Sequence, residues 1–180
     1  LSDYFTVGVG QAVGLRLANP PLFTGVIANV LWDSFTVELI DVEGNVVSTD
    51  MSTELGVTQT AGPVGGAISG TPVERATLGR VTFDDLSYSL PSLPGGLTIA
   101  IGDAALVFEP LNFLLTVHPG STDRIDIEIA EEQVAGVPFS IRVIVRDSDG
   151  NIKTDYTGTV RIQTPDNHDA GDVDANLRDI

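Results

Sequence analysis

Hydrophobic and polar residues alternate over several short segments of this chain. Between positions 141 and 146, aliphatic residues occupy every second position, at Ile141, Val143 and Val145. Arg142 and Arg146 occupy alternate positions of the opposite phase. A period of two places neighbouring side chains on opposite faces of a β-strand. The pattern therefore predicts a strand whose aliphatic side chains face a core and whose arginines face solvent. No window longer than about ten residues has the spacing of an amphipathic helix.

The same alternation occurs near position 37, where Phe35, Val37 and Leu39 are expected to face inward and Thr36 and Glu38 outward. Clusters of glycine and proline separate the strand segments, as is typical of turns. Further strands are predicted at Val13–Ala18, Glu54–Thr60, Arg80–Phe83, Leu97–Ile101, Ala105–Phe108, Phe113–Val117, Ile125–Ala130 and Thr159–Gln163. Many short strands at this spacing indicate a β-sandwich or barrel, so the predicted fold class is all-β.

An internal repeat relates two parts of the chain. Residues 35–46 align without a gap to residues 141–152, which moves Asp41 onto Asp147, a shift of 106 positions. One immunoglobulin-like sandwich has a similar length of about 100 residues. We therefore expect immunoglobulin-like β-sandwich repeats in tandem. Residues 1–9 are assigned to the end of a preceding unit or a linker, residues 10–115 to one repeat, and residues 116–180 to part of a second repeat.

Three segments share their order and spacing with a known type of repeat: Gly79–Ser87, then Ala135–Val143 followed by Asp147–Asn151, then Tyr156–Val160. Together they resemble the bacterial immunoglobulin-like (Big or invasin-like) tandem repeats of giant cell-surface proteins and adhesins. The resemblance implies a non-catalytic structural segment, such as a stalk, shaft, filament or coat, that is extracellular or at the cell surface. It also implies that the partners of the segment are neighbouring repeats of the same chain.

The composition is acidic, rich enough in apolar residues for a core, and free of cysteine. The formal net charge is −16, and 42% of the residues are hydrophobic. Without cysteine, disulfides and cysteine metal sites are excluded. A negative surface repels nucleic acid and anionic lipid, and no apolar run approaches the length of about 18 residues that indicates a membrane span. The chain begins with Leu1 and is interpreted as part of a longer protein.

Acidic residues near the expected boundary between the repeats are candidate calcium ligands. Asp123, Asp126 and Glu128 lie beside this boundary, and Asp147 and Asp149 alternate in a turn that contains glycine. Ca²⁺ prefers carboxylate oxygens, and an ion held between two units would stiffen a stalk. The alternative is a hairpin turn in which the aspartate accepts backbone N–H bonds, or a solvated acidic loop. A second candidate group near the end of the sequence comprises Asp166, Asp169, Asp172 and Asp174.

Reactive side chains form no recognisable catalytic motif. The histidines are His118 and His168, and the sequence contains neither a G-x-S-x-G elbow nor an H-E-x-x-H metal motif. The chain is therefore predicted not to be an enzyme, with no catalytic or cofactor-binding residues. Trp32 is expected in the core rather than in a sugar site. Two alternatives stay open: a ligand-binding module for a glycan or host-surface receptor, built on loops Gly62–Pro72 and Pro91–Gly96, and an accessory domain of a secreted hydrolase.

Overall fold

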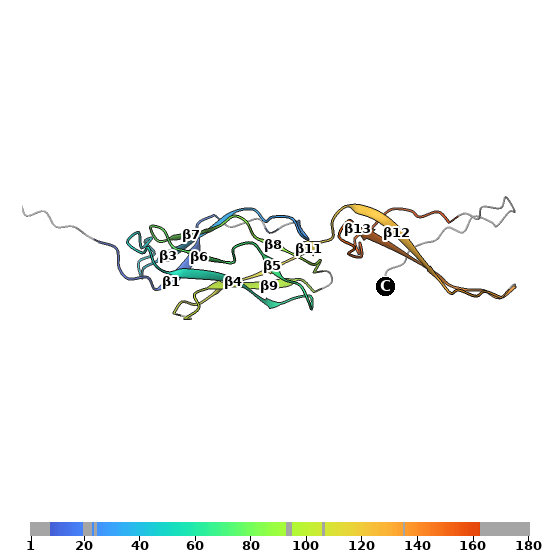
Figure 1. Cartoon of the computed structure of the whole chain (residues 1–180). Helices are drawn as coiled ribbons and strands as arrows, with labels where there is room; N and C mark the ends of the chain where they lie inside the picture. Colours follow the sequence, from blue (N-terminus) through green and yellow to red (C-terminus); the bar gives the residue numbers. More distant parts are fainter. Residues whose placement is uncertain are drawn as a thin grey trace, which may run out of the picture.

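The structure is a computed structural model that describes residues 8–19, 23, 25–92, 95–105, 107–134 and 136–162. These residues form thirteen β-strands and no helix. None of them therefore belongs to a helix long and apolar enough to cross a membrane. A larger body carries the first eleven strands, and a two-stranded ribbon follows it along the same long axis (Figure 1). The predicted all-β class is confirmed.

Two antiparallel sheets build the larger body. The first has the order β1–β3–β7, with strands Gly14–Leu17, Phe35–Ile40 and Arg80–Phe83. The second has the order β10–β9–β4–β6, with strands Leu111–Leu115, Leu97–Gly102, Glu54–Ala61 and Val73–Arg75. Inward side chains of both sheets belong to one hydrophobic cluster, so the two sheets form a β-sandwich.

Three shorter pairs complete the described strands. The antiparallel pair β5–β8 comprises Ile68–Ser69 and Ser87–Tyr88. The parallel pair β2–β11 comprises Val26–Ile27 and Val117–His118, and Val117 belongs to the core of the sandwich. The ribbon is the antiparallel pair β12–β13, with strands Thr122–Ile129 and Ile141–Asp147.

Strand β3 shows why the two sheets pack together. Its inward residues Phe35, Val37 and Leu39 are at most 1% exposed, as their alternation predicts. They belong to one cluster with Ile99 and Ile101 from β9 on the opposite sheet. Full burial of each such side chain contributes about 1.5–3 kcal/mol to folding. The alternation of β3 and β9 therefore supplies much of the stability of the sandwich.

An aromatic cluster closes one part of this core. Trp32 is 6% exposed, and its ring lies edge-on to Phe23 with the ring centroids 6.0 Å apart. Phe23 also contacts the rings of Phe35 and Phe113, at centroid distances of 5.8 Å and 5.6 Å. The prediction that the tryptophan belongs to the core is confirmed.

Glu38 is not solvated, which corrects the prediction for the outer face of β3. Antiparallel pairing places Glu38 between Arg16 on β1 and Arg80 on β7. Their guanidinium nitrogens lie 2.6 Å and 2.9 Å from its carboxylate oxygens, and Glu38 is only 6% exposed. The hydrogen bond from Arg16 lowers the pKa of Glu38, burial opposes this effect, and Arg80 adds to it. The alternation correctly predicted that Glu38 lies on the outer face of β3. It did not predict that Arg16 and Arg80 shield the Glu38 carboxylate from water.

Two predicted strands are not strands in the structure. Of residues 105–108, the structure describes 105, 107 and 108, and none of these three belongs to a strand. The Asp103 carboxylate accepts the backbone N–H groups of Val107 and Phe108 at 3.1 Å each. This capping ties both amides into a turn, so they are not available to a neighbouring strand. Residues 159–162 belong to no strand, and position 163 lies outside the described residues.

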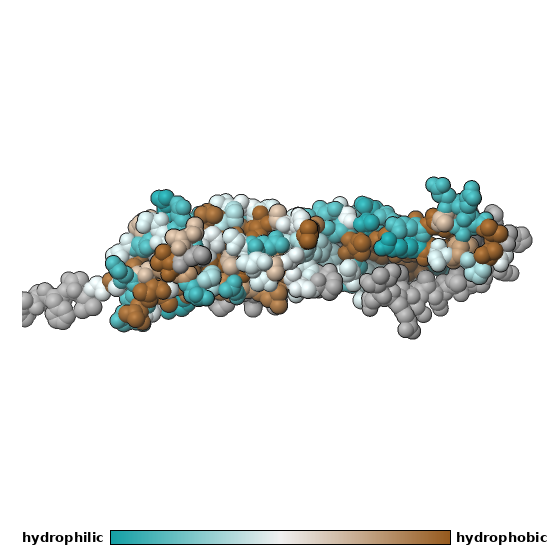
Figure 2. All heavy atoms as spheres, turned by 90° about the horizontal axis from the view of Figure 1, so that it is seen from below, coloured by the Kyte–Doolittle hydropathy of each residue, from teal (hydrophilic) through white to brown (hydrophobic). Residues whose placement is uncertain are grey.

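The ribbon has one aliphatic face. Its register pairs three aliphatic residues of each strand: Ile125 with Val145, Ile127 with Val143, and Ile129 with Ile141. Directly opposed residues share a face, so these six side chains lie on the same side of the ribbon. Apolar residues are exposed over the ribbon end of the molecule, next to hydrophilic ones (Figure 2).

Ion pairs lie on the other face of the ribbon. Arg142 contacts Glu128 at 3.0 Å, and Arg146 contacts Asp126 at 2.7 Å. Both arginines occupy the outward positions that the alternation of β13 predicts.

Candidate functional site: the aspartate turns and the junction

A capped turn follows β3. The carboxylate of Asp41 accepts hydrogen bonds from the backbone N–H groups of Gly10, Glu43 and Asn45, at 3.0, 3.1 and 2.8 Å. The side-chain amide of Asn45 adds a fourth bond at 3.3 Å. Gly44 has a φ of 82°, which an L-residue with a side chain rarely adopts. Asp41 therefore joins the strand end, the turn and the segment that enters β1.

The turn after β13 has the same construction. Asp147 accepts the backbone N–H groups of Gly120, Asp149 and Asn151 at 2.9, 3.1 and 2.8 Å. The side-chain amide of Asn151 donates at 3.0 Å, and Gly150 has a φ of 83°. The hairpin-turn alternative for the Asp147 segment is confirmed, because its carboxylate is taken up by these donors.

Sequence reasoning missed the glycine that donates to each aspartate from a distance. Gly10 lies 31 residues before Asp41, whereas Gly120 lies 27 residues before Asp147. A gapless shift of 106 positions does not align the two glycines, so the internal repeat alone did not reveal them. An alignment with a four-residue gap between the glycine and the aspartate would have found this signal.

Both capping aspartates have a lowered pKa. For Asp41, the Gly10 N–H has the largest effect and lowers the pKa; burial opposes it, and Asn45 and Glu43 add to it. For Asp147, burial acts to raise the pKa, but the donors from Asn151 and Gly120 outweigh it. Both carboxylates are therefore held in the charged form that four N–H donors require.

The junction between sandwich and ribbon has a short connection and direct contacts. Residues 119–121 alone separate β11 from β12. The side-chain amide of Asn29 donates to the Asp149 carboxylate at 2.9 Å, which links a sandwich loop to the Asp147 turn. His118 Nδ1 lies 3.8 Å from an Asp155 carboxylate oxygen, and Ala28 donates its N–H to the His118 carbonyl at 2.9 Å. The Asn29–Asp149 and His118–Asp155 contacts thus link the sandwich to the segment that follows β13.

The five predicted calcium ligands are placed on the ribbon and its turn. Asp126 forms ion pairs with Arg146 and, at 3.3 Å, with Arg124, and Glu128 pairs with Arg142. Asp149 accepts a hydrogen bond from Asn29, and Asp147 accepts the N–H groups of its turn. Asp123 is exposed. Within the described ranges, no three acidic or histidine side chains converge on a point that could hold a metal ion. The second candidate group, Asp166, Asp169, Asp172 and Asp174, lies outside the described residues, as does His168.

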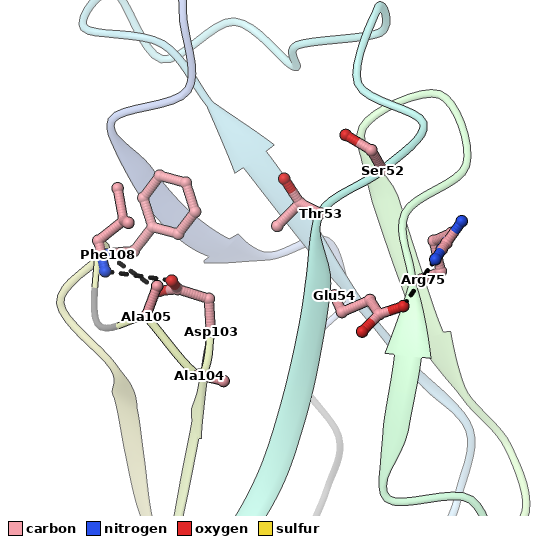
Figure 3. Close-up of a pocket in the computed structure, with 9 residues that line it drawn as sticks. Ser52, Thr53, Glu54, Arg75, Asp103, Ala104, Ala105 and Phe108 are labelled. Atoms are coloured by element: carbon pink, nitrogen blue, oxygen red, sulfur yellow. Dashed lines mark hydrogen bonds and ion pairs between the residues drawn. The ribbon is translucent and has the colours of Figure 1, made fainter.

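A hollow beside β4 holds polar side chains (Figure 3). Glu54 forms an ion pair with Arg75 at 2.8 Å, and the Asp103 carboxylate accepts the N–H of Phe108 at 3.1 Å. Burial acts to raise the pKa of Asp103, but backbone donors outweigh it and lower the pKa. The carboxylates are thus already engaged in structural contacts, and no histidine is among the residues that line the hollow.

The two loops expected to form a binding end lie together in the structure. Ala61, Gly62 and Pro63 line one hollow with Pro91, Ser92, Gly95 and Gly96. These lining residues include neither a charged nor an aromatic side chain. Ligand binding at these two loops stays a prediction.

Comparison with known proteins shows no family. No family model matches the chain, and no curated protein matches it. Among solved structures, the chain is similar to part of the surface layer protein SbsC, domains 4–9, with 15% sequence identity and a TM-score of 0.38. The match covers 78% of this chain and 21% of that structure, so this chain spans about a fifth of its length.

Proposed function

We propose that this chain is a non-catalytic structural segment, such as a stalk, shaft, filament or coat, of a large extracellular bacterial surface protein with a role in adhesion. In this proposal, immunoglobulin-like sandwiches follow one another in tandem along the chain. One observation carries it: the capped turn at Asp41 recurs at Asp147 with the same set of donors. A recurring structure of this kind is the mark of a repeated unit.

The strand order supports an immunoglobulin-like unit. Seven strands correspond in chain order to strands A to G of such a sandwich: β1, β3, β4, β6, β7, β9 and β10. The order β1–β3–β7 is then A–B–E, and β10–β9–β4 is G–F–C. Strand β6 lies beside β4, so the fourth strand joins the second sheet. The sandwich therefore has this topology with one edge strand exchanged between the sheets.

The ribbon corresponds to the first pair of a further unit. Gly10 precedes β1 and donates to the aspartate that ends β3, and Gly120 precedes β12 and donates to the aspartate that ends β13. The pairs β1–β3 and β12–β13 are both antiparallel. The tandem arrangement would then be joined end to end by residues 119–121, with the Asn29–Asp149 contact across the joint.

Small-angle scattering tests the proposed shape. The 180-residue chain is expected to scatter as an elongated particle, because three connecting residues and direct contacts restrict the joint. A scattering curve typical of a compact globule would contradict a stalk or shaft.

The joint itself is tested by replacing Asp149 with alanine. This change removes the acceptor for the Asn29 side-chain amide, so we expect wider motion between sandwich and ribbon, which NMR relaxation measures. The free energy of unfolding of the sandwich is expected to change by less than about 1 kcal/mol. The matched control is Glu43→Ala, at the equivalent position of the first turn, where the backbone N–H also donates to the capping aspartate at 3.1 Å. Equal motion in both variants would contradict a role of Asp149 in the joint.

Calcium binding at the joint stays a prediction, and thermal unfolding tests it. If an ion binds the folded chain, the melting temperature rises with millimolar Ca²⁺ relative to chelator, because a ligand that binds only the folded state stabilises it. An unchanged melting temperature would contradict the prediction. The contacts of Asp126, Glu128, Asp147 and Asp149 with N–H groups and arginines would then be their structural role.

A further inference from the structure

The joint between sandwich and ribbon contains a hollow that both bodies line. Its lining comprises Gly25, Ile27 and His118 from the sandwich, and residues 119–122, Lys153 and Asp155 from the segments that follow. At the same joint, the Asn29 side-chain amide donates to the Asp149 carboxylate at 2.9 Å. These residues show how the end of one body contacts the next body along the chain.

A second hollow, the N-terminal hollow, lies at the other end of the sandwich. The segment that enters β1 lies away from the ribbon (Figure 1), and β3 ends beside it, since Gly14 pairs with Ile40. The N-terminal hollow is lined by residues 9–12 together with Val47, Thr49, Asp50, Ser52 and Phe108. It therefore lies where a body preceding the sandwich would contact it.

The two hollows are built from equivalent positions. Gly10 and Gly120 each donate to the aspartate that caps a turn, so residues 9–12 align with residues 119–122. The internal repeat, with its shift of 106 positions, places Lys153 on Val47 and Asp155 on Thr49. Every residue that follows His118 in the lining of the joint thus has a counterpart in the lining of the N-terminal hollow. The N-terminal hollow is therefore one half of such a joint.

The acceptor of the joint also has a counterpart. Glu43 is equivalent to Asp149, and its backbone N–H donates to Asp41 at 3.1 Å, as that of Asp149 does to Asp147. Glu43 is exposed. A carboxylate thus occupies the position that accepts the Asn29 amide at the other joint. A partner with a side-chain amide in its loop would satisfy this carboxylate in the same way.

The charged groups of the joint are replaced together. At the ribbon, Asp155 lies 3.8 Å from His118 and 2.8 Å from the Lys153 ammonium. The equivalent positions at the other end are Thr49, Gly8 and Val47, none of which carries a charge. Because all three change together, the N-terminal hollow would leave no charge without its counterpart. Its partner is therefore expected to be neutral where it faces Thr49.

We propose that the N-terminal hollow and Glu43 form the docking surface for the end of a preceding β-sandwich, whose loop donates a side-chain amide to Glu43. This inference rests on the proposed tandem arrangement and adds the surface and the chemistry of the partner. The partner presents small and aliphatic residues to the hollow, as Gly25 and Ile27 do at the ribbon joint.

An internal duplication of residues 8–117 in the full chain tests the proposal. It places Gly8 directly after Val117 of the first copy, so that a second sandwich follows the first at the proposed surface. The chain contains no cysteine, and Thr58 is exposed, so Thr58→Cys in both copies allows one spin-label distance to be measured between them. A docked pair is expected to give a single narrow distance distribution. A broad distribution, as flexibly linked domains give, overturns the proposal.

Substitutions in the second copy show which side chain holds the joint. Glu43→Ala is expected to broaden the distribution, because it removes the acceptor for Asn29 of the first copy. The control Glu132→Ala changes the charge equally at an exposed position of the ribbon hairpin and is expected to leave the distribution narrow. Equal distributions in the two variants overturn the role of Glu43.

The natural joint separates the two proposals. In the full chain without duplication, spin labels at Thr58→Cys and Glu128→Cys report the distance between sandwich and ribbon. A narrow distribution there, with a broad one in the duplicated chain, overturns the docking surface alone. Broad distributions in both chains also contradict the restricted joint of the proposed function.

Discussion

Replacing Val37 by aspartate is expected to unfold the sandwich. Val37 lies in β3 between Leu17 of β1 and Val81 of β7 and is 0% exposed. The aspartate would have no partner for its charge in this aliphatic surrounding, and a buried unpaired charge costs about 4 kcal/mol or more. A domain has a total stability of about 5–15 kcal/mol, so most or all of it is lost. Urea unfolding followed by circular dichroism measures the change.

Thr36→Asp is the matched control, one residue earlier on the outer face of the same strand. The hydroxyl of Thr36 lies 2.9 Å from the hydroxyl of Thr82, and loss of this contact is expected to lower the stability by about 1 kcal/mol. Equal destabilisation by the two substitutions would show that the faces of β3 are assigned wrongly. The equivalent ribbon residue, Val143, is only partly buried, so aspartate there costs the monomer less than it does at position 37.

Acid is expected to lower the stability of the fold. Burial acts to raise the pKa of Asp103 and of Asp147, but their hydrogen-bond donors outweigh it, so both values are lower than the ordinary 3.8. The unfolded chain therefore binds protons at a higher pH than the folded chain does. The stabilisation is present above pH 3.8 and is lost as the pH falls through this value towards the lower folded pKa. Lowered pKa values at Glu38, Asp41, Asp50 and Asp85 add to the effect.

Urea midpoints measured from neutral pH down to acid check this dependence. Asp103→Asn is expected to be less stable at neutral pH, because its amide nitrogen cannot accept an N–H, and to lose less stability in acid. Ile99→Val serves as a control, because it lowers stability by about 0.5–1.5 kcal/mol without changing a titratable group. The control should keep the full slope of stability against pH. The same slope in Asp103→Asn would contradict the assigned role of this carboxylate.

Much of the fold could be predicted from the sequence where a signal is local. The alternation of Phe35, Val37 and Leu39 predicted a strand and its buried face, and the structure leaves these side chains at most 1% exposed. The internal repeat predicted that Asp41 and Asp147 are equivalent, and glycine and asparagine beside them predicted turns. A period of two is a property of the strand itself, and the turn chemistry lies within five residues. Such patterns can be recognised before any tertiary contact is known.

Contacts between distant segments were decided only by the tertiary structure. Glu38 is buried because antiparallel pairing places Arg16 and Arg80 beside it, 22 and 42 residues away in the sequence. Val107 and Phe108 belong to no strand because the Asp103 carboxylate accepts their backbone N–H groups, although their apolar side chains are typical of a strand. The Asn29–Asp149 contact joins residues 120 positions apart. The sequence by itself thus determined the all-β class, the core face of β3 and the two related turns. The partners of each buried charge and the contacts between sandwich and ribbon depend on strand register and tertiary packing. These cannot be recognised in a short window of sequence.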